Sequence, residues 1–273
     1  MMTLTDIAND YVDNLSLRPV TLDLDFLQRL NRAHLTHYTF NSLSVVLGED
    51  MPLDIVHLHN KIVTRRRGGY CFEHNKLALH VLSKLGFDVR LVLAKVVYNR
   101  DIDVPRTHRI SLVTLDGDDY LLDVGFGPLG PRHPVKLSTP GIQTQGNEQF
   151  RVIKGEHGEL GLQVHKDGDF STLYTFNTHN YSEAECTPPH FYSHKSPEAA
   201  FVNNLVIAKK SDNHIESLRN GTWHRTHDGV LTEHTITSAE HLSTVMNEVF
   251  DLDIDLASAT YLFNRFVLPA VSQ

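Results

Sequence analysis

Cys71, His108 and Asp123 are the residues of this sequence whose types together could support nucleophilic catalysis. A thiolate attacks electrophilic carbonyl groups, an imidazole takes up the thiol proton, and a carboxylate holds that imidazole in one tautomer. Cys71 closely follows Gly68 and Gly69, which permit a sharp turn that a side chain would obstruct. The residue types therefore predict covalent chemistry through a cysteine.

The residues after Cys71 predict a helix that ends at Gly86, a usual C-terminal cap. Four residues at three- and four-residue steps share its apolar face: Asn75, Ala78, Leu82 and Leu85. At the first turn of a helix, unpaired N–H groups and the helix dipole favour negative charge on the sulfur. A buried structural cysteine is the alternative interpretation of the same pattern.

A β-hairpin is predicted to place Asp123 near His108. Residues 116–119 form a turn signal between two strand-like segments. If these strands pair, residue 123 faces residue 110 or 112 and lies on the sheet face of His108. Asp123 is flanked by apolar residues, and a buried carboxylate needs a partner such as an imidazole. The alternative is an aspartate that caps a turn beside a surface histidine.

Charge and cysteine content argue against several classes of protein. The net charge of −8 argues against nucleic acid or an anionic membrane as the main partner. Two cysteines are too few for a disulfide framework. The chain has no apolar stretch of about 18 residues and no signal-peptide pattern at its start. We therefore expect a cytoplasmic protein.

The hydrophobic pattern changes twice along the chain and predicts three regions. Up to Gly86 it is mostly helical, with helices expected after Thr3 or Thr5, from Asp23 and from Asp54, and an extended piece at 38–48. From Asp88 to Tyr181, short strands separated by Gly and Asp predict a meandering antiparallel sheet or barrel. A Pro- and His-rich stretch from Ser182 is interpreted as a linker. Beyond it we expect strands and one helix: 205–208, 222–226, 229–236 and 238–249.

Three motifs resemble those of the arylamine N-acetyltransferases in order and spacing. They are Arg67-Gly68-Gly69-Tyr70-Cys71-Phe72-Glu73, Thr107-His108 and Asp123-Val124-Gly125-Phe126-Gly127. The similarity extends to Phe40 with Leu43-Ser44-Val45, and to Lys195-Ser196-Pro197 ahead of Phe201. It covers nearly the whole chain and becomes weaker beyond about residue 205.

The resemblance implies an α+β fold with a papain-like Cys-His-Asp core. Residues 1–87 would be an N-terminal helical domain carrying the nucleophile, and residues 88–200 a central antiparallel β-barrel carrying the histidine and the aspartate. Residues 201–273 would be a C-terminal α/β lid. By motif position, Cys71 is the nucleophile, His108 the base and Asp123 its orienter.

The resemblance also implies acetyl-CoA as acetyl donor and a place in xenobiotic metabolism, and we expect no metal. Arylamines, arylhydrazines or N-hydroxyarylamines would accept the acetyl group from a Cys71 thioester in a ping-pong scheme. Phe40 and Phe126 would line the acceptor pocket, Thr107 would lie close to the substrate, and Tyr192 and Ser196 near the coenzyme. An amide synthase or a thiol hydrolase could use the same three residues, and a binding protein would leave them unexplained.

Two departures from the family pattern bear on the site. Asn41-Ser42 replaces a Glu-Asn pair whose glutamate is expected to pair with Arg67. Arg67 therefore needs another partner here. Asn41 could form a hydrogen bond with its guanidinium, although a weaker one than a glutamate would form. Arg67 itself belongs to a run of three arginines that is either a solvated face or contains a buried anchor. Glu198 stands where the family favours a small hydroxyl residue, and its charge would repel coenzyme phosphates.

Three further features have ordinary interpretations. Cys186 is interpreted as an unreactive thiol. Lys209 and Lys210 could meet coenzyme phosphates, but a solvated surface pair is the simpler interpretation. His57 and His59 resemble half of a metal site that no neighbouring cysteine or carboxylate cluster completes.

Overall fold

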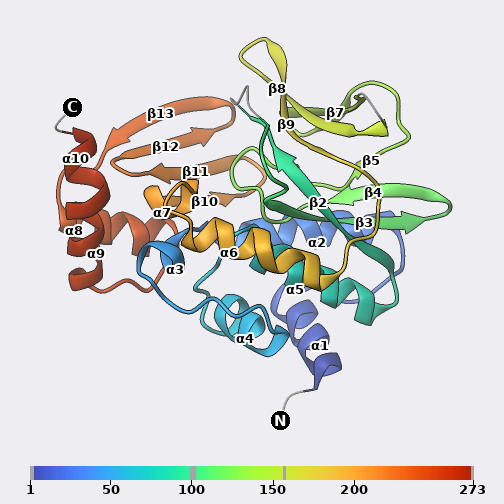
Figure 1. The fold of residues 1–273 in the computed structure, drawn as a ribbon, viewed down its shortest axis with the longest axis horizontal. Coiled ribbons are helices and arrows are strands. Elements are labelled where there is room, and N and C mark those ends of the chain that lie inside the picture. The colour runs from blue at the N-terminus through green and yellow to red at the C-terminus, as the bar shows by residue number, and fades with distance from the viewer. Residues whose placement is uncertain (1–2, 99–102, 156–157, 272–273) are drawn as a thin grey trace.

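The computed structural model describes residues 3–98, 103–155 and 158–271, which form a mixed α and β fold with two antiparallel sheets (Figure 1). In Figure 1 the N-terminal helices lie below, the eight-stranded sheet at upper right, and the five-stranded sheet at upper left. Residues 1–2 and 272–273, at the ends of the first and third predicted domains, lie outside the described part. Within that part, no helix is long and apolar enough to cross a membrane.

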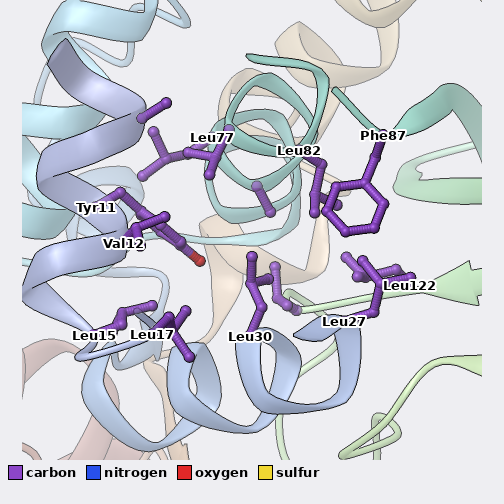
Figure 2. Packing of buried hydrophobic residues seen from close by; sticks show 14 of the residues in the cluster. Tyr11, Val12, Leu15, Leu17, Leu27, Leu30, Leu77, Leu82, Phe87 and Leu122 are labelled. Carbon is purple, nitrogen blue, oxygen red and sulfur yellow. The ribbon is translucent and has the colours of Figure 1, made fainter. Parts of the chain in front are cut away.

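Three helices build the N-terminal core: α1 (Leu4–Asn14), α2 (Leu24–His37) and α5 (Cys71–Leu85). The first two begin at predicted caps, where the side chains of Thr3 and Asp23 accept backbone N–H groups of the first turn. Figure 2 shows apolar side chains of all three helices meeting a residue of the barrel sheet in one cluster: Tyr11, Val12, Leu27, Leu30, Leu77, Leu82 and Leu122. The helical part thus packs directly on the sheet.

α5 begins and ends where the sequence predicts. Gly86 closes it with a φ of 101°, in the left-handed region. Gly68, with a φ of 64°, lies so close to Thr39 that a Cβ there would collide with the carbonyl oxygen of that residue. At the first turn, Glu73 accepts the N–H of Tyr70 and forms a buried ion pair with Lys61 at 2.6 Å. These contacts fix the backbone on both sides of Cys71.

The extended piece predicted at 38–48 is wrong for most of its length. Only β1 (Phe40–Asn41) is a strand, and the short helix α3 (Leu43–Val46) follows it. The Asn41 side chain causes the change, because its Oδ1 accepts the N–H two residues further on and starts a turn. The helix expected from Asp54 is divided into α4 (Ile55–His59) and the π-helical turn η1 (Asn60–Thr64).

The eight-stranded sheet is the predicted barrel, nearly closed. Its order is β5-β4-β3-β2-β9-β8-β7-β6. Between the terminal strands, Gln143 exchanges two hydrogen bonds with the backbone of Lys136, and Gln145 two with that of His133. The strands are β2 (Asp88–Val96), β3 (His108–Leu115), β4 (Asp118–Leu122), β5 (Val135–Lys136), β6 (Gln143–Gln145), β7 (Glu148–Lys154), β8 (Leu160–Lys166) and β9 (Asp169–Phe176).

The hairpin of β3 and β4 has the predicted register. Ser111 pairs with Leu122, so the next residue, Asp123, comes opposite Ile110. Ile110 and His108 are both buried and are two residues apart on β3, so they lie on one face of the sheet. The turn between the strands thereby brings the carboxylate next to the imidazole.

The five-stranded sheet has the order β1-β10-β11-β12-β13. It packs on C-terminal helices through a second apolar cluster that includes Leu218, Leu242, Phe250 and Leu262. Strand β11 and the helices after residue 255 were not predicted. The elements are β10 (Val206–Lys210), β11 (His214–Arg219), β12 (Thr222–His227), β13 (Val230–Thr235), α8 (Ala239–Thr244), η4 (Val245–Val249), α9 (Leu256–Leu262), η5 (Phe263–Val267) and α10 (Leu268–Val271).

The predicted linker from Ser182 is helical, so that prediction is wrong. It contains η3 (Glu183–Cys186), α6 (Thr187–Lys195) and α7 (Ala200–Asn203). Pro188 and Pro189 lie in the first turn of α6, where a missing N–H group loses no helical hydrogen bond. The domain boundaries after residues 87 and 200 stay a prediction, and β1 of the first region pairs with β10 of the third.

Candidate active site

Cys71 is the first residue of α5 and is almost completely buried. Its Sγ lies 3.7 Å from the carbonyl oxygen of Thr107, and its thiol also forms a hydrogen bond with His108. A Cβ on Gly125 would come within 3.0 Å of the Cα of Cys71, so the loop after Asp123 packs directly on the start of the helix. The close approach of Gly125 explains how the thiol of a helix reaches the barrel.

His108 and Asp123 form a buried pair, with Nε2 and Oδ2 2.7 Å apart. Burial alone lowers the pKa of His108, but the charge of Asp123 and the hydrogen bonds to Asp123 and Cys71 outweigh it and raise the pKa. Burial raises the pKa of Asp123, and the charge and hydrogen bond of His108 outweigh this effect, so the pKa is lowered. The pair is thus most stable as imidazolium and carboxylate, with Nδ1 left for Cys71.

Each carboxylate oxygen of Asp123 has two hydrogen-bond donors. Asn75 donates to Oδ1 at 2.9 Å and the N–H of Gly125 donates to the same atom at 2.9 Å. Tyr174 donates its hydroxyl to Oδ2 at 3.0 Å. Four donors, counting His108, therefore hold the carboxylate in one orientation and compensate its burial.

A cavity of about 210 Å³ opens in front of the thiol. Engineered apolar cavities of about 150 Å³ bind benzene, so this one has room for an aromatic ring with a small substituent. Its lining combines aromatic and small residues with a few polar ones: Phe40, Cys71, Val96, Thr107, His108, Gly125, Phe126, Tyr192, Ser193, Glu198, Ala199, Ala200 and Phe201.

The structure brings together all but one of the site residues predicted from the sequence. Phe40, Thr107, Phe126 and Tyr192 line the cavity beside Cys71 and His108, and Asp123 lies behind His108. Ser196 does not line it. Its hydroxyl accepts the N–H of Glu198 at 3.3 Å and so shapes the turn that carries this glutamate.

Arg67 is a partly buried anchor, and its partner is Glu49 rather than Asn41. Its Nη2 donates to Glu49 Oε1 at 2.9 Å. Asn41 binds the arginine through the main chain instead, because its Nδ2 donates to the carbonyl oxygen of Arg67 at 2.9 Å. The suggestion that Asn41 bonds the guanidinium is therefore wrong. The two residues before Arg67 are exposed.

The lysine pair is not a solvated surface pair. Lys210 is buried, and its Nζ donates to Gly130 O at 2.6 Å, Glu148 Oε1 at 2.8 Å and Pro128 O at 3.1 Å. Burial lowers its pKa to about 8. Lys209 forms an ion pair with Asp251. The buried ammonium thus joins β10 to the loop that follows Phe126.

The two weaker candidates have structural surroundings. Cys186 is buried 3.6 Å from a guanidinium nitrogen of Arg109, and burial raises its pKa to about 11, so its thiol stays protonated at neutral pH. His59 Nε2 donates to Oδ2 of Asp10 at 2.7 Å. Within the described ranges, no group of three or more His, Cys, Asp or Glu residues could hold a metal ion.

Two residues that hold Asp123 in place, Asn75 and Tyr174, were not predicted as site residues from the sequence. A signal existed for Asn75, because an amide on an otherwise apolar helix face needs buried partners; besides Asp123 it bonds Arg109 O at 2.7 Å. Tyr174 gave no such signal, since a tyrosine in a strand has an ordinary role in a hydrophobic core. Its partner lies 51 positions away in the chain.

Comparison with known proteins gives the class and then the family. A family model described as N-acetyltransferase matches residues 23–259, so the protein is an acyltransferase. An arylamine N-acetyltransferase of Mycolicibacterium smegmatis is 34% identical over 86% of this chain and 88% of its own. The arylamine N-acetyltransferase / N-hydroxyarylamine O-acetyltransferase of Salmonella typhimurium is 27% identical over 92% and 91%. The chain belongs to the arylamine N-acetyltransferase family.

Solved structures agree with this assignment. The structure of Mycobacterium marinum arylamine N-acetyltransferase in complex with CoA superposes with a TM-score of 0.89, covering 95% of this chain and 99% of the other at 27% identity. One relative has a different name: proansamycin X synthase of Amycolatopsis mediterranei, 32% identical over 58% of this chain and 62% of its own. Names within this set of relatives are therefore not uniform.

Proposed function

We propose that this protein transfers the acetyl group of acetyl-CoA to arylamines, and to N-hydroxyarylamines at oxygen, through a thioester on Cys71. The observation that carries the proposal is the thiol of Cys71 at a ring-sized cavity, hydrogen-bonded to a histidine whose positive charge is stabilised by Asp123. The Salmonella relative, whose name includes both activities, supports the extension to oxygen acceptors.

In the first half-reaction the thiol proton of Cys71 passes to Nδ1 of His108. The thiolate attacks the carbonyl carbon of acetyl-CoA, and the thiolate of the coenzyme leaves and takes up the proton from His108. Because one thioester replaces another, little free energy is lost, whereas a serine ester would be a deeper trap. Asp123 keeps the imidazole in one orientation and stabilises its charge.

In the second half-reaction the neutral amine attacks the acetyl carbon. His108 accepts the proton of the attacking nitrogen, and the thiolate of Cys71 leaves and recovers a proton. Phe40 and Phe126 enclose the aromatic ring, and the small cavity limits competition by water. We assign Tyr192 and Ser196 to the surroundings of the coenzyme. The complex of the Mycobacterium marinum relative with CoA supports this donor.

Acetyl-CoA alone tests this mechanism. We expect a stoichiometric burst of free coenzyme and an increase of about 42 Da on the peptide that contains Cys71, the mass of an acetyl group replacing hydrogen. Aniline should then discharge the thioester, and steady-state plots should give parallel lines. Intersecting lines without an acetylated peptide would mean direct transfer in a ternary complex and would overturn the role of Cys71.

Two other activities are distinguished by the same experiment. A thiol hydrolase on the same residues would discharge the thioester rapidly without amine. An amide synthase, the alternative to which the differently named Amycolatopsis relative draws attention, would not need acetyl-CoA and would give no burst with it. We further propose a cytoplasmic role in xenobiotic metabolism, in a compartment where the Cys71 thiol stays reduced.

A further inference from the structure

The cavity contains one carboxylate without a partner. Glu198 lines it, and no described residue forms an ion pair with Glu198 or a hydrogen bond to its carboxylate. The backbone of this residue is nevertheless fixed. Its N–H donates to Ser196 Oγ, and the N–H of Ala199 donates to Ser196 O at 3.0 Å, in a turn that Pro197 stiffens. Glu198 is thus held at the wall of the cavity with its charge unneutralised.

The other lining residues do not compensate this charge. Among the residues that the structure describes, the lining contains no lysine or arginine. The imidazolium of His108 is paired with the carboxylate of Asp123, so these two residues add no net charge when Cys71 is acetylated. When Cys71 is acetylated, Glu198 therefore carries the one net charge among the described lining residues, and Coulomb interactions in the cavity are stronger than in bulk water because protein atoms replace part of the solvent.

The size of the cavity indicates which of the two substrates interacts with the charge of Glu198. About 210 Å³ holds one substituted ring, whereas a whole coenzyme with its phosphates is several times larger. The phosphates of acetyl-CoA therefore remain outside, and only the acyl end of the donor reaches Cys71. An aromatic acceptor fits the cavity itself, where it would contact the wall that carries Glu198.

We propose that Glu198 determines acceptor specificity: it favours arylamines with a positively charged ring substituent and disfavours those with a carboxylate. This proposal rests on the proposed acetyl transfer and names the acceptor class of the same cavity. A cationic substituent gains an ion pair with Glu198. An anionic substituent meets a like charge, and the described lining residues offer it no lysine or arginine.

The test compares two pairs of acceptors matched in shape. 4-Aminobenzylamine, whose aliphatic amine is protonated at pH 7.5, is compared with neutral 4-aminobenzyl alcohol. Anionic 4-aminobenzoate is compared with neutral 4-aminobenzamide. The rate of discharge is measured in single turnovers with enzyme acetylated beforehand, so that binding of acetyl-CoA does not enter, and the N-aryl product is identified by chromatography.

Glu198→Gln should lower the ammonium-to-alcohol rate ratio about tenfold and raise the benzoate-to-benzamide ratio by a similar factor. A tenfold change corresponds to about 1.4 kcal/mol. Glu198→Lys should reverse both preferences. Intrinsic reactivities of the four amines cancel, because each ratio is compared between proteins. Glu248→Gln is the matched control: it removes one exposed carboxylate on η4, outside the cavity lining, and should change neither ratio more than about twofold.

Each outcome is decisive. Unchanged ratios in Glu198→Gln, or equal changes in Glu248→Gln, would overturn the proposal. A change confined to the rate of acetylation by acetyl-CoA would also overturn it, since the carboxylate would then act on the donor. Glu198 is exposed, so the variants are expected to fold, and a circular dichroism spectrum and a Tm like those of the wild type verify this. If no protein acetylates the neutral amines at all, the proposed function itself fails.

Discussion

His108 in the barrel and His34 in the helical part are equally shut off from solvent, with 2% and 0% exposure, but their ionisation differs. Burial, reinforced by the neighbouring His74, lowers the pKa of His34 well below its usual value. Burial acts in the same direction on His108, yet Asp123 outweighs it and raises the pKa. The partner of a buried histidine, and not its depth, therefore decides its charge.

The partners in the helical part are all neutral. The carbonyl oxygen of Thr39 can only accept, so His74 donates to it from Nε2, at 3.3 Å. His74 Nδ1 then accepts from His34 Nε2 at 2.7 Å, and His34 Nδ1 accepts the hydroxyl of Tyr11 at 2.7 Å. This histidine chain is satisfied with both imidazoles uncharged. We expect it to contribute to stability, and the barrel pair to reactivity.

The largest expected effect concerns the thiol beside the charged histidine. Cys71→Ser should lower acetyl transfer at least about 10⁴-fold, because an alcohol is not ionised by the imidazole as a thiol is. Cys186→Ser should stay within about twofold, although Cys186 is buried beside a charged Arg109. Steady-state kcat/KM values for aniline measure both. Equal losses of activity in the two variants would mean that Cys71 is not the nucleophile.

A smaller effect is expected when the charge of the barrel pair is removed. In Asp123→Asn, burial should outweigh the remaining interaction with Cys71, lower the pKa of His108 and make it neutral at pH 7, like His34. Transfer should fall about 10³-fold, and alkylation of Cys71 by iodoacetamide at pH 7 should slow in parallel. Circular dichroism should report a folded protein of lower stability.

The matched control lies in the same hairpin. Asp119 pairs with Arg90 at 2.5 Å and is outside the cavity. Asp119→Asn should therefore leave the alkylation rate unchanged while it removes the same charge. A wild-type alkylation rate in Asp123→Asn would contradict both the pair and the comparison with His34.

The elements that the sequence predicts correctly depend on local signals. α5 has a cap at each end and an apolar face, and the β3–β4 hairpin has a turn signal that sets its register. Two predictions failed because tertiary contacts decide the outcome. β1 is a strand only where β10 pairs with it, through Phe40 and Ala208. The helix at Thr187–Lys195 contains two prolines that suggest a linker, and the buried His190 fixes it through Tyr70 and Met51.

The candidate site, like the fold, could be predicted only in part from the sequence. Cys71, His108 and Asp123 could be found from residue types, spacing and resemblance. The pairing of Arg67 could not, because Glu49 replaces a partner that the family has elsewhere in the sequence. The charge of the cavity also required the structure, since the isolation of Glu198 depends on which side chains surround it.

The pH dependence of stability should separate the two histidine environments. The pKa of His74 is lowered by burial to about 4, while the unfolded value is about 6.5. Between these values the unfolded chain binds more protons, so stability falls as the pH falls, by about 3 kcal/mol for this residue at pH 4. The pair of His108 and Asp123 acts oppositely, because it stabilises the fold at pH values between the pKa values of Asp and His in the unfolded chain. This stabilisation is lost as the pH rises through the raised pKa of His108. It is also lost as the pH falls through the lowered pKa of Asp123.

Urea unfolding at pH steps from 7 to 4.5 measures this slope. His74→Gln should reduce the uptake of protons on unfolding by about one, whatever its effect on absolute stability. His190, whose pKa burial also lowers to about 4, contributes equally in both proteins. An unchanged slope would mean that His74 is not buried in its neutral form.

The smallest effects come from removing one hydroxyl in each environment, Tyr11→Phe and Tyr174→Phe. Tyr11 is the donor that ends the histidine chain, and without it the Nδ1 of His34 is a buried acceptor with no partner, which costs about 1–2 kcal/mol of unfolding free energy. Tyr174 is one of four donors to Asp123, so its loss should cost only about 1 kcal/mol of unfolding free energy.

The effects of the two substitutions on activity should have the reverse order. Tyr11→Phe should keep kcat/KM within about twofold, because the other end of the histidine chain bonds the carbonyl oxygen of Thr39 and not the thiol of Cys71. Tyr174→Phe should lower kcat/KM about fivefold, since Asp123 Oδ2, which orients His108, becomes less constrained. If Tyr11→Phe lowered activity more than Tyr174→Phe at equal stability, the histidine chain would have a role in the reaction, and the division between a stabilising and a reactive environment would have to be abandoned.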